Sequence, residues 1–408
     1  MWPAAVLRRI FIPPTLVARQ FASTLFFRHL IGWRHYSRWL CRHSFKSLPV
    51  AAGAVGMGCI GFPAHPVWEV TAACNLSCIH CHASSGRPDP DELSTEESKR
   101  LIDQLAGCDE FRMLVYTGGE PLCRSDIFEL LEHSARRGFI NVIASNGTLI
   151  TAEVARRLKA AGVYGVAISL DSADPRIHNH IRTSDKAFEL ALRGIENVRR
   201  SGMLLQINIT AMEYNFETLG QLLEIAEGCR SGIVLMYQLV PVGRGQVIGE
   251  ASLTVNQNEK LLKFLAEKQK KVSVLIEPVA GPQYWPYLME HRGKQSRFWR
   301  RLAAPVFHGC AAGRGFVYIK ANGDVWPCPF IEASAGSIRQ ADFKKIWVEA
   351  DIFRKLRQRE SLLQGKCGRC DYRKICGGCR GRALTLKGDL MAEDPSCFID
   401  VAEAAAGR

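Results

Sequence analysis

The stretch CNLSCIHCHA, residues 74–83, places three cysteines within eight positions: Cys74, Cys78 and Cys81. It follows an apolar, β-rich run at residues 67–71, so the thiols are expected on the loop after a first strand. A structural zinc ion takes four ligands and closes its coordination shell. Three thiols on one loop therefore favour a group that keeps one coordination position open.

Apolar strand-like runs and helical stretches alternate along the chain from residue 66. The expected strands lie at 67–71, 113–117, 141–145, 165–170, 205–210 and 233–239, and the expected helices at 94–107, 125–137, 151–161, 185–201 and 215–228. Such alternation implies parallel βαβ units. We therefore predict an α/β fold, a partial (β/α)6 TIM-like barrel that stays open, with a small Cys-rich C-terminal domain.

Local signals support several of these elements. Ser94 followed by Glu97 has the pattern of a capping box, and Thr151 and Gly162 delimit another helix. Residues 316–328 predict a hairpin with a type I′ turn at Asn322-Gly323. A strand is expected at VSVLIEP, within a stretch that we interpret as a linker or a cap on the substrate side, and one helix at 342–359.

These patterns predict four parts of the chain. They are a basic N-terminal extension (1–65), the barrel core (66–270), the linker or cap (271–306) and the Cys-rich domain (307–400). The first 68 residues hold eight Arg and Lys residues and no Asp or Glu, so they contribute eight of the chain's 13 net positive charges. This segment has the composition of a transit peptide, of a membrane-surface segment, or of a poorly ordered extension. The uncharged run 47–68 is long enough to span a bilayer, but it is rich in Gly, Ala and Pro.

The rest of the chain is only mildly basic, and it has no recognisable nucleic-acid-binding motif, so we expect no nucleic-acid partner. The chain has 15 cysteines, several of them in C-x2-C units. That arrangement is typical of metal binding and not of a disulfide framework, so a reducing, cytoplasmic setting is expected.

The spacing C-x3-C-x2-C, with the motif TGGEP at residues 117–121, resembles the radical S-adenosylmethionine (radical SAM) enzymes. In that family three thiolates hold a [4Fe–4S] cluster whose open iron binds S-adenosylmethionine (SAM). Reductive cleavage of SAM gives a 5′-deoxyadenosyl radical that takes hydrogen from the substrate. The resemblance implies an electron donor such as flavodoxin or ferredoxin. One local difference is His80, because the family usually has an aromatic residue before the third cysteine.

The same resemblance implies where SAM binds. The expected cofactor-binding residues follow the carboxyl ends of strands: Gly118, Gly119, Glu120, Ser145, Asn146, Ser169 and Asp171, with Arg182 further along. Glu120 would accept from the ammonium of SAM, and Arg182 would pair with its carboxylate. Residues 243–245 would border the adenine. No catalytic acid or base is expected, because radical hydrogen abstraction does not require one.

A second group of cysteines resembles the SPASM or twitch extension of this family. By that resemblance Cys367, Cys370, Cys376 and Cys397 bind an auxiliary [4Fe–4S] cluster. Cys310, Cys328 and Cys379 are left as either a second auxiliary site with an open iron or structural thiols. Cys379 follows Cys376 by two residues, where the family usually has three. Read alone, two C-x2-C units also fit a zinc knuckle.

The C-terminal segments, including CGRCDYRKICGGC at 367–379, resemble the radical SAM enzymes of haem biosynthesis. That group contains Fe-coproporphyrin III decarboxylase (haem b synthase), didecarboxysiroheme deacetylase and a haem d1 enzyme. The resemblance implies a tetrapyrrole substrate, for which Arg182, Arg244, Arg314 and the basic stretch 292–301 are candidate partners. One alternative is a peptide-modifying or enzyme-maturing SPASM enzyme. Another is a noncatalytic iron–sulfur electron carrier or a zinc scaffold.

Overall fold

The computed structural model describes residues 65–400, apart from 109, 112, 295 and 305–308. One sheet carries the fold. Its strands are β1 (His65–Glu69), β2 (Met113–Thr117), β3 (Ile140–Ser145), β4 (Val163–Ser169), β5 (Leu204–Ala211), β6 (Ile233–Gln238), β7 (Leu275–Val279), β8 (Phe316–Ile319) and β9 (Val325–Trp326). Their order is β7-β6-β5-β4-β3-β2-β1-β8-β9. All six expected strands are present, and the predictions for residues 1–64 lie outside the described part.

The sheet is parallel from β7 to β8, and its first seven strands follow one another in chain order. The strand expected at VSVLIEP is β7, which pairs with β6 and widens the sheet. At the other end β8 pairs in parallel with β1, and β9 returns antiparallel to β8. The result is the predicted open α/β barrel, with β1 near the C-terminal strands and β7 at the free edge.

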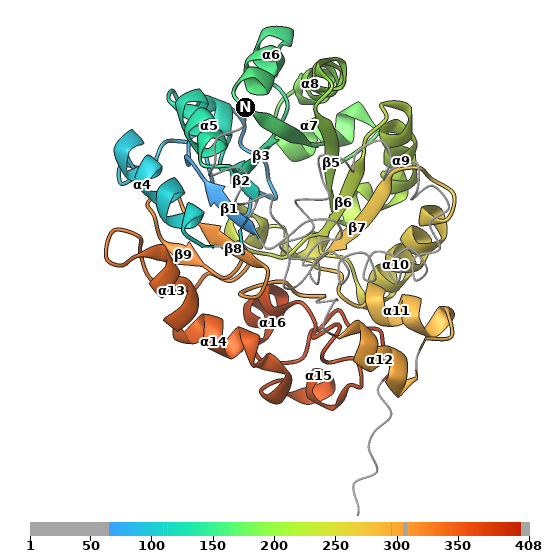
Figure 1. Ribbon diagram of the computed structural model, residues 1–408. Coiled ribbons are helices and arrows are strands. Elements are labelled where there is room, and N and C mark those ends of the chain that lie inside the picture. Colours follow the sequence, from blue (N-terminus) through green and yellow to red (C-terminus); the bar gives the residue numbers. More distant parts are fainter. Residues whose placement is uncertain (1–64, 109, 112, 295, 305–308, 401–408) are drawn as a thin grey trace, which may run out of the picture.

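Helices surround the outer side of this sheet (Figure 1). They are α4 (Thr95–Ala106), α5 (Ile127–Arg136), α6 (Ala152–Ala160), α7 (Pro175–Arg182), α8 (Ala187–Ser201), α9 (Leu219–Gly228) and α10 (Val255–Gln269). Ser94 and Glu97 form the predicted capping box of α4, and the Thr151 side chain caps α6. Gly162 follows α6 with a φ of +85°, as expected of a glycine that ends a helix.

The C-terminal part packs below the open side of the barrel (Figure 1). Its helices are α11 (Tyr284–His291), α12 (Arg297–Ala303), α13 (Phe343–Glu349), α14 (Asp351–Arg357), α15 (Gly365–Arg369) and α16 (Arg380–Lys387). The expectation of one helix at 342–359 was wrong. Ala350 is extended and separates α13 from α14, and the break lets the rings of Trp347 and Phe353 pack at 4.9 Å.

The predicted hairpin at 316–328 is present as β8 and β9, but the type I′ turn was wrong. Such a turn needs positive φ at both central residues. Gly323 has a φ of +89°, whereas Asn322 is not among the residues with positive φ. Gly323 instead donates its N–H to the carbonyl of Lys320, and Lys320 donates to that of Asp324. The connection is thus a longer loop that needs only one left-handed residue.

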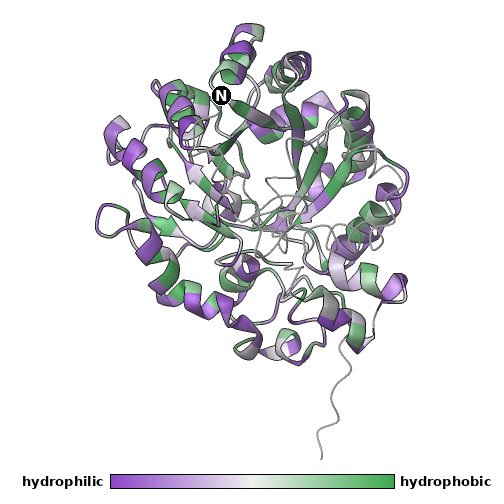
Figure 2. Ribbon diagram, in the orientation of Figure 1, coloured by the Kyte–Doolittle hydropathy of each residue, from purple (hydrophilic) through white to green (hydrophobic). Residues whose placement is uncertain are grey.

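Apolar side chains are concentrated on the strands and on the helix faces that cover them, and the outer helix faces are hydrophilic (Figure 2). The buried core runs without a break from the barrel into α11 and α13. Among the described residues, no helix has the length and apolar composition needed to cross a membrane.

Candidate active site

Cys74, Cys78 and Cys81 lie together on the loop between β1 and α4. Burial raises the pKa of the Cys74 thiol to about 11, a hydrogen bond from the backbone of Leu76 opposes this, and the other two thiols are close enough to raise it further. Backbone hydrogen bonds from Cys74 to Gly86 and from Cys81 to Cys78 fold the loop. A cysteine must lose its proton to bind a metal, so binding to a metal cluster stabilises the thiolate and offsets this raised pKa. The loop therefore fits a group that binds three thiolates.

The segment after β6 holds this loop in place. The Arg244 side chain donates to the carbonyls of Cys78 at 2.9 Å and Ser85 at 2.6 Å, and its backbone N–H donates to Cys81 at 3.0 Å. A Cβ on Gly243 would lie 2.3 Å from the His82 carbonyl oxygen. Arg244 was expected to border the adenine or to bind a tetrapyrrole. The contacts seen here are instead with the backbone of the cysteine loop.

The motif at the end of β2 packs against the start of the same loop. Gly119 and Glu120 donate backbone hydrogen bonds to the carbonyls of Thr71 and Ala73, both at 2.8 Å. A Cβ on Gly119 would lie 2.3 Å from the Ala73 oxygen, and one on Gly118 would lie 2.5 Å from the Thr71 oxygen. Both glycines are thus required by the close approach of two backbones.

Glu120 is fully buried at this junction and meets residues that follow β3. Its carboxylate accepts from the Ser145 hydroxyl at 2.9 Å and from the Asn146 backbone N–H at 2.8 Å. Burial raises the pKa of Glu120 to about 7, although these hydrogen bonds oppose the shift. Asn146 also donates from its side chain to Asn75 at 2.8 Å. Asn75 was not among the expected site residues, although its place directly after Cys74 was an available signal.

Asp171, after β4, joins several elements around the thiols. One carboxylate oxygen accepts from the Thr210 backbone at 3.0 Å, and the other is 2.7 Å from Arg182 Nη2 and 3.6 Å from His80 Nε2. Burial is the largest single influence on the pKa of Asp171 and would raise it, but Arg182, the nearby histidines and the Thr210 hydrogen bond together lower the pKa. Arg182 Nη1 also lies 3.7 Å from the Cys78 sulfur. This cation therefore stands directly beside the cysteine loop.

Arg182 belongs to α7, a helix that the sequence analysis missed. The helix begins after Asp174, whose side chain accepts from the Arg176 backbone, with Pro175 in the first position. An Asp-Pro start of this kind is a recognisable helix signal. His178 on the same helix accepts from the Asp171 backbone N–H. Ser169 ends β4 in register with Asn208, so it lies at the same edge of the sheet.

The four cysteines assigned to an auxiliary cluster come together. Cys367, Cys370, Cys376 and Cys397 line one cavity, together with Gly377 and Gly378 among others. Burial raises the pKa of Cys376 well above its usual value, and the charges of the other three thiols add to this effect. Four thiols around one cavity match the ligand number of a [4Fe–4S] cluster.

The remaining three cysteines form a second group closer to the barrel. The half-buried Cys328 thiol interacts electrostatically with both Cys310 and Cys379. The Tyr318 hydroxyl, on β8, is near enough to interact with Cys81 on one side and Cys328 on the other. Among the described residues, no three Cys, His, Asp or Glu side chains converge as one metal ion would require. An iron–sulfur cluster does not require its ligands to converge on one point, because each thiolate binds a different iron atom.

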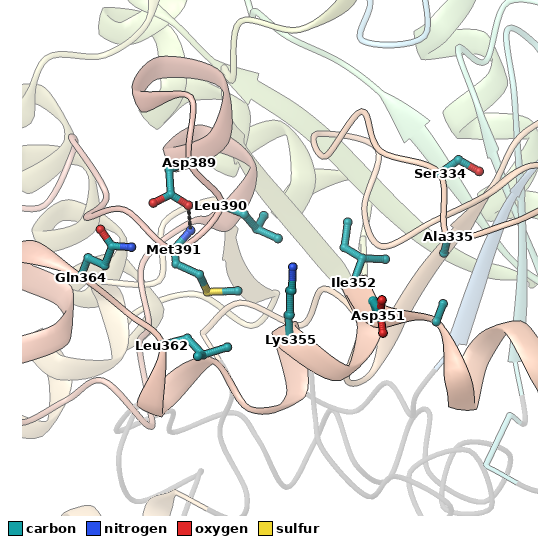
Figure 3. A pocket seen from close by; sticks show the side chains of 11 residues that line it. Ser334, Ala335, Asp351, Ile352, Lys355, Leu362, Gln364, Asp389, Leu390 and Met391 are labelled. Atoms are coloured by element: carbon teal, nitrogen blue, oxygen red, sulfur yellow. Dashed lines mark hydrogen bonds between the residues drawn. The ribbon is translucent and has the colours of Figure 1, made fainter.

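Other predicted anion partners have protein partners of their own. Arg314 pairs with Glu360, and Arg300, in the basic stretch, pairs with Asp371 at 2.8 Å. A separate depression lies over α14 and the segment before α15 (Figure 3). Its lining is mostly apolar around Lys355 and contains none of the predicted site residues.

The chain matches the Radical SAM superfamily over residues 68–226 and the SPASM iron–sulfur cluster-binding domain over residues 310–371. It is 37% identical to an AdoMet-dependent heme synthase of Methanosarcina barkeri, over 81% of this chain and 95% of that protein. A second AdoMet-dependent heme synthase, of Nitratidesulfovibrio vulgaris, is 36% identical over 81% and 90%. The mycofactocin maturase MftC of Mycobacterium tuberculosis is 32% identical over 84% of each chain.

Among solved structures, Streptococcus suis SuiB bound to its precursor peptide SuiA superimposes with a TM-score of 0.63 at 18% identity. The match covers 83% of this chain and 76% of that one. The likeness supports the fold, an open parallel barrel followed by a Cys-rich domain. With its three-cysteine loop, its TGGEP segment and the extent of these matches, the chain belongs to the radical SAM enzymes that carry a SPASM domain, and binds a [4Fe–4S] cluster, SAM and auxiliary iron–sulfur clusters.

Proposed function

We propose that the protein removes carboxylate groups from the propionate side chains of an iron tetrapyrrole, in the manner of a haem synthase. The observation that carries this proposal is the similarity to two AdoMet-dependent heme synthases, which extends over nearly their whole length. In the proposed reaction a hydrogen atom leaves the β-carbon of a propionate. Loss of CO2 and one electron then leaves a vinyl group.

When bound, the cluster and SAM supply the reducing electron and the hydrogen-abstracting radical. We propose that Cys74, Cys78 and Cys81 hold that cluster, and that the glycines of TGGEP let protein backbone polar groups approach SAM closely. Auxiliary clusters at the two C-terminal thiol groups would be placed to take up the electron released by the substrate. The electrostatic interaction of Tyr318 with both Cys81 and Cys328 supports a short separation between the first thiol group and the nearer C-terminal one.

Glu120 is proposed to bind the ammonium group of SAM. A hydrogen bond to a charged group is worth about 1.5–3 kcal/mol, so Glu120→Gln is expected to weaken SAM binding roughly 10–100-fold. The pKa of Glu120 in the free protein is about 7, above its usual value, so the carboxylate forms only as the pH rises through 7. SAM affinity should therefore increase over that range.

Anaerobic titration calorimetry at several pH values tests this role. The Glu120→Gln variant should lose both the affinity and its rise with pH. Glu129→Gln is the control, because Glu129 is exposed on the outer surface, where it pairs with Lys99. Equal SAM affinity in wild type and Glu120→Gln would contradict the assignment.

The substrate is tested with the reconstituted protein under strictly anaerobic conditions. Incubation with SAM, a strong reductant and Fe-coproporphyrin III is expected to give 5′-deoxyadenosine and a porphyrin that loses CO2 stepwise. Mass spectrometry monitors the porphyrin. Deoxyadenosine with an unchanged porphyrin would refute this substrate, and siroheme derivatives and precursor peptides would be assayed next. No deoxyadenosine from a cluster-loaded protein would refute the reaction itself.

The setting of this reaction is also proposed. Every cysteine of the described residues is a free thiol, which supports a reducing cytoplasmic compartment. We further propose flavodoxin or ferredoxin as the electron donor, and contact of the basic N-terminal extension with an anionic membrane surface.

A further inference from the structure

The side chain of Arg359 is fully buried, and no carboxylate among the described residues forms an ion pair with it. It lies in η5 (Arg359–Ser361) with no solvent exposure. None of its three guanidinium nitrogens has a hydrogen-bond partner among the described residues. Burial lowers its pKa to about 10, so the group is still a cation near neutral pH. A buried charge without an opposite charge is strongly unfavourable, and this one calls for an anion.

The position of Arg359 shows where that anion must be. A Cβ on Gly377 would lie 2.9 Å from Arg359 Nε, so the guanidinium packs against the loop between Cys376 and Cys379. The segment just before Cys310 runs along the same loop, since Gly309 donates to the Ile375 carbonyl at 2.6 Å. Among the groups near Arg359, the Cys310 thiol has the largest stabilising effect on the charged form of the Arg359 guanidinium.

Other buried arginines of this region already have partners. Arg380 donates to the carbonyls of Leu390 and Ala392, at 2.9 and 2.6 Å. Arg382 pairs with Asp394 at 2.9 Å. Arg359 differs from both, because its guanidinium is buried to the same degree but donates to no oxygen acceptor among the described residues.

We infer that Arg359 is the counter-ion and N–H···S hydrogen-bond donor of an iron–sulfur cluster bound by Cys310, Cys328 and Cys379. This inference rests on the proposed second auxiliary site. A [4Fe–4S]²⁺ core with three thiolates carries a net negative charge, and reduction adds another. A neighbouring cation stabilises the reduced form and so raises the reduction potential, which depends on net charge and on hydrogen bonds to sulfur. Arg359 is thus a positioning residue that makes this cluster a better electron acceptor.

The test uses the full, reconstituted chain and no tetrapyrrole. Iron is counted per chain, and the reduction of each cluster is followed by EPR during a redox titration of wild type, Arg359→Gln and Arg359→Lys. Cys310→Ala identifies the signal that belongs to this site. We expect Arg359→Gln to make that one cluster at least tenfold harder to reduce, a shift of 59 mV for one electron. Arg359→Lys should restore part of the shift.

Arg354→Gln is the matched control, because it removes the same charge from an exposed position on α14. It should leave the potential unchanged. If Arg359→Gln cannot be loaded with this cluster, recovery of the iron content in Arg359→Lys supports the role of the charge. Equal loss of iron in both variants overturns it. An unchanged potential in Arg359→Gln, or the same iron content in Cys310→Ala as in wild type, would also overturn the inference. Neither result would affect the decarboxylation assay, which measures the porphyrin.

Discussion

Replacement of Cys78 by alanine is expected to reduce 5′-deoxyadenosine formation to background. Cys78 is buried at the centre of the three-cysteine loop, with Arg182 3.7 Å from its sulfur. A cluster held by only two of its three thiolates loses both an iron ligand and its fixed position for SAM. Reconstituted protein should therefore contain about four fewer iron atoms per chain, the content of one [4Fe–4S] cluster. Iron analysis and chromatography of the nucleoside products measure the two effects.

Cys229→Ala provides the control for that experiment. Cys229 follows α9, where its thiol donates to the Ala226 carbonyl. Its loss removes a thiol from the outer layer of the barrel and leaves the cysteine loop intact, so iron content and deoxyadenosine should match wild type. Full deoxyadenosine formation by Cys78→Ala would mean that the loop does not hold the SAM-cleaving cluster.

Asp394→Ala is expected to give the largest loss of stability, about 3–5 kcal/mol, the usual cost of removing one member of a buried ion pair. Asp394 is 2% exposed and accepts from Arg382 at 2.9 Å, from the Cys379 backbone at 2.8 Å and from Gln283 at 2.8 Å. The substitution leaves the buried Arg382 without its counter-ion. It also frees the loop that carries Cys379 from Gln283, directly before α11, and removes the partner that orients Arg382 toward Gln238 at the end of β6.

The midpoint of urea unfolding, measured anaerobically on loaded protein, reports this loss. Asp351→Ala is the matched comparison, because Asp351 forms an exposed pair with Arg354 that is worth about 0–1 kcal/mol. Asp394→Asn should fall between the two, since it keeps the shape and loses the charge. Equal midpoints for Asp394→Ala and Asp351→Ala would exclude Asp394 as a link between the domain and the barrel.

The site could be read from the sequence where ligands share one loop or follow one strand. The spacing of Cys74, Cys78 and Cys81 is a local property, and the three thiols lie on the loop after the first strand, as expected. Glu120 and Ser145 follow neighbouring parallel strands, whose carboxyl ends must meet, so their contact at 2.9 Å was also predictable. The predicted turn type at Asn322 and the predicted continuous helix through Ala350 were wrong, because tertiary packing sets the backbone conformation at both positions.

By itself the sequence determined the alternation of strands and helices, the caps of α4 and α6, the thiol spacing and the family, because each depends on residues close together in the chain. Only the tertiary structure decided how side chains far apart in sequence pair. Arg244 reaches the Cys78 carbonyl across 166 residues, and Arg382 reaches Gln238 across 144. Neither arginine has a local pattern that distinguishes it from a surface arginine. The same holds for Arg359, whose buried charge becomes visible only when folding removes the water around it.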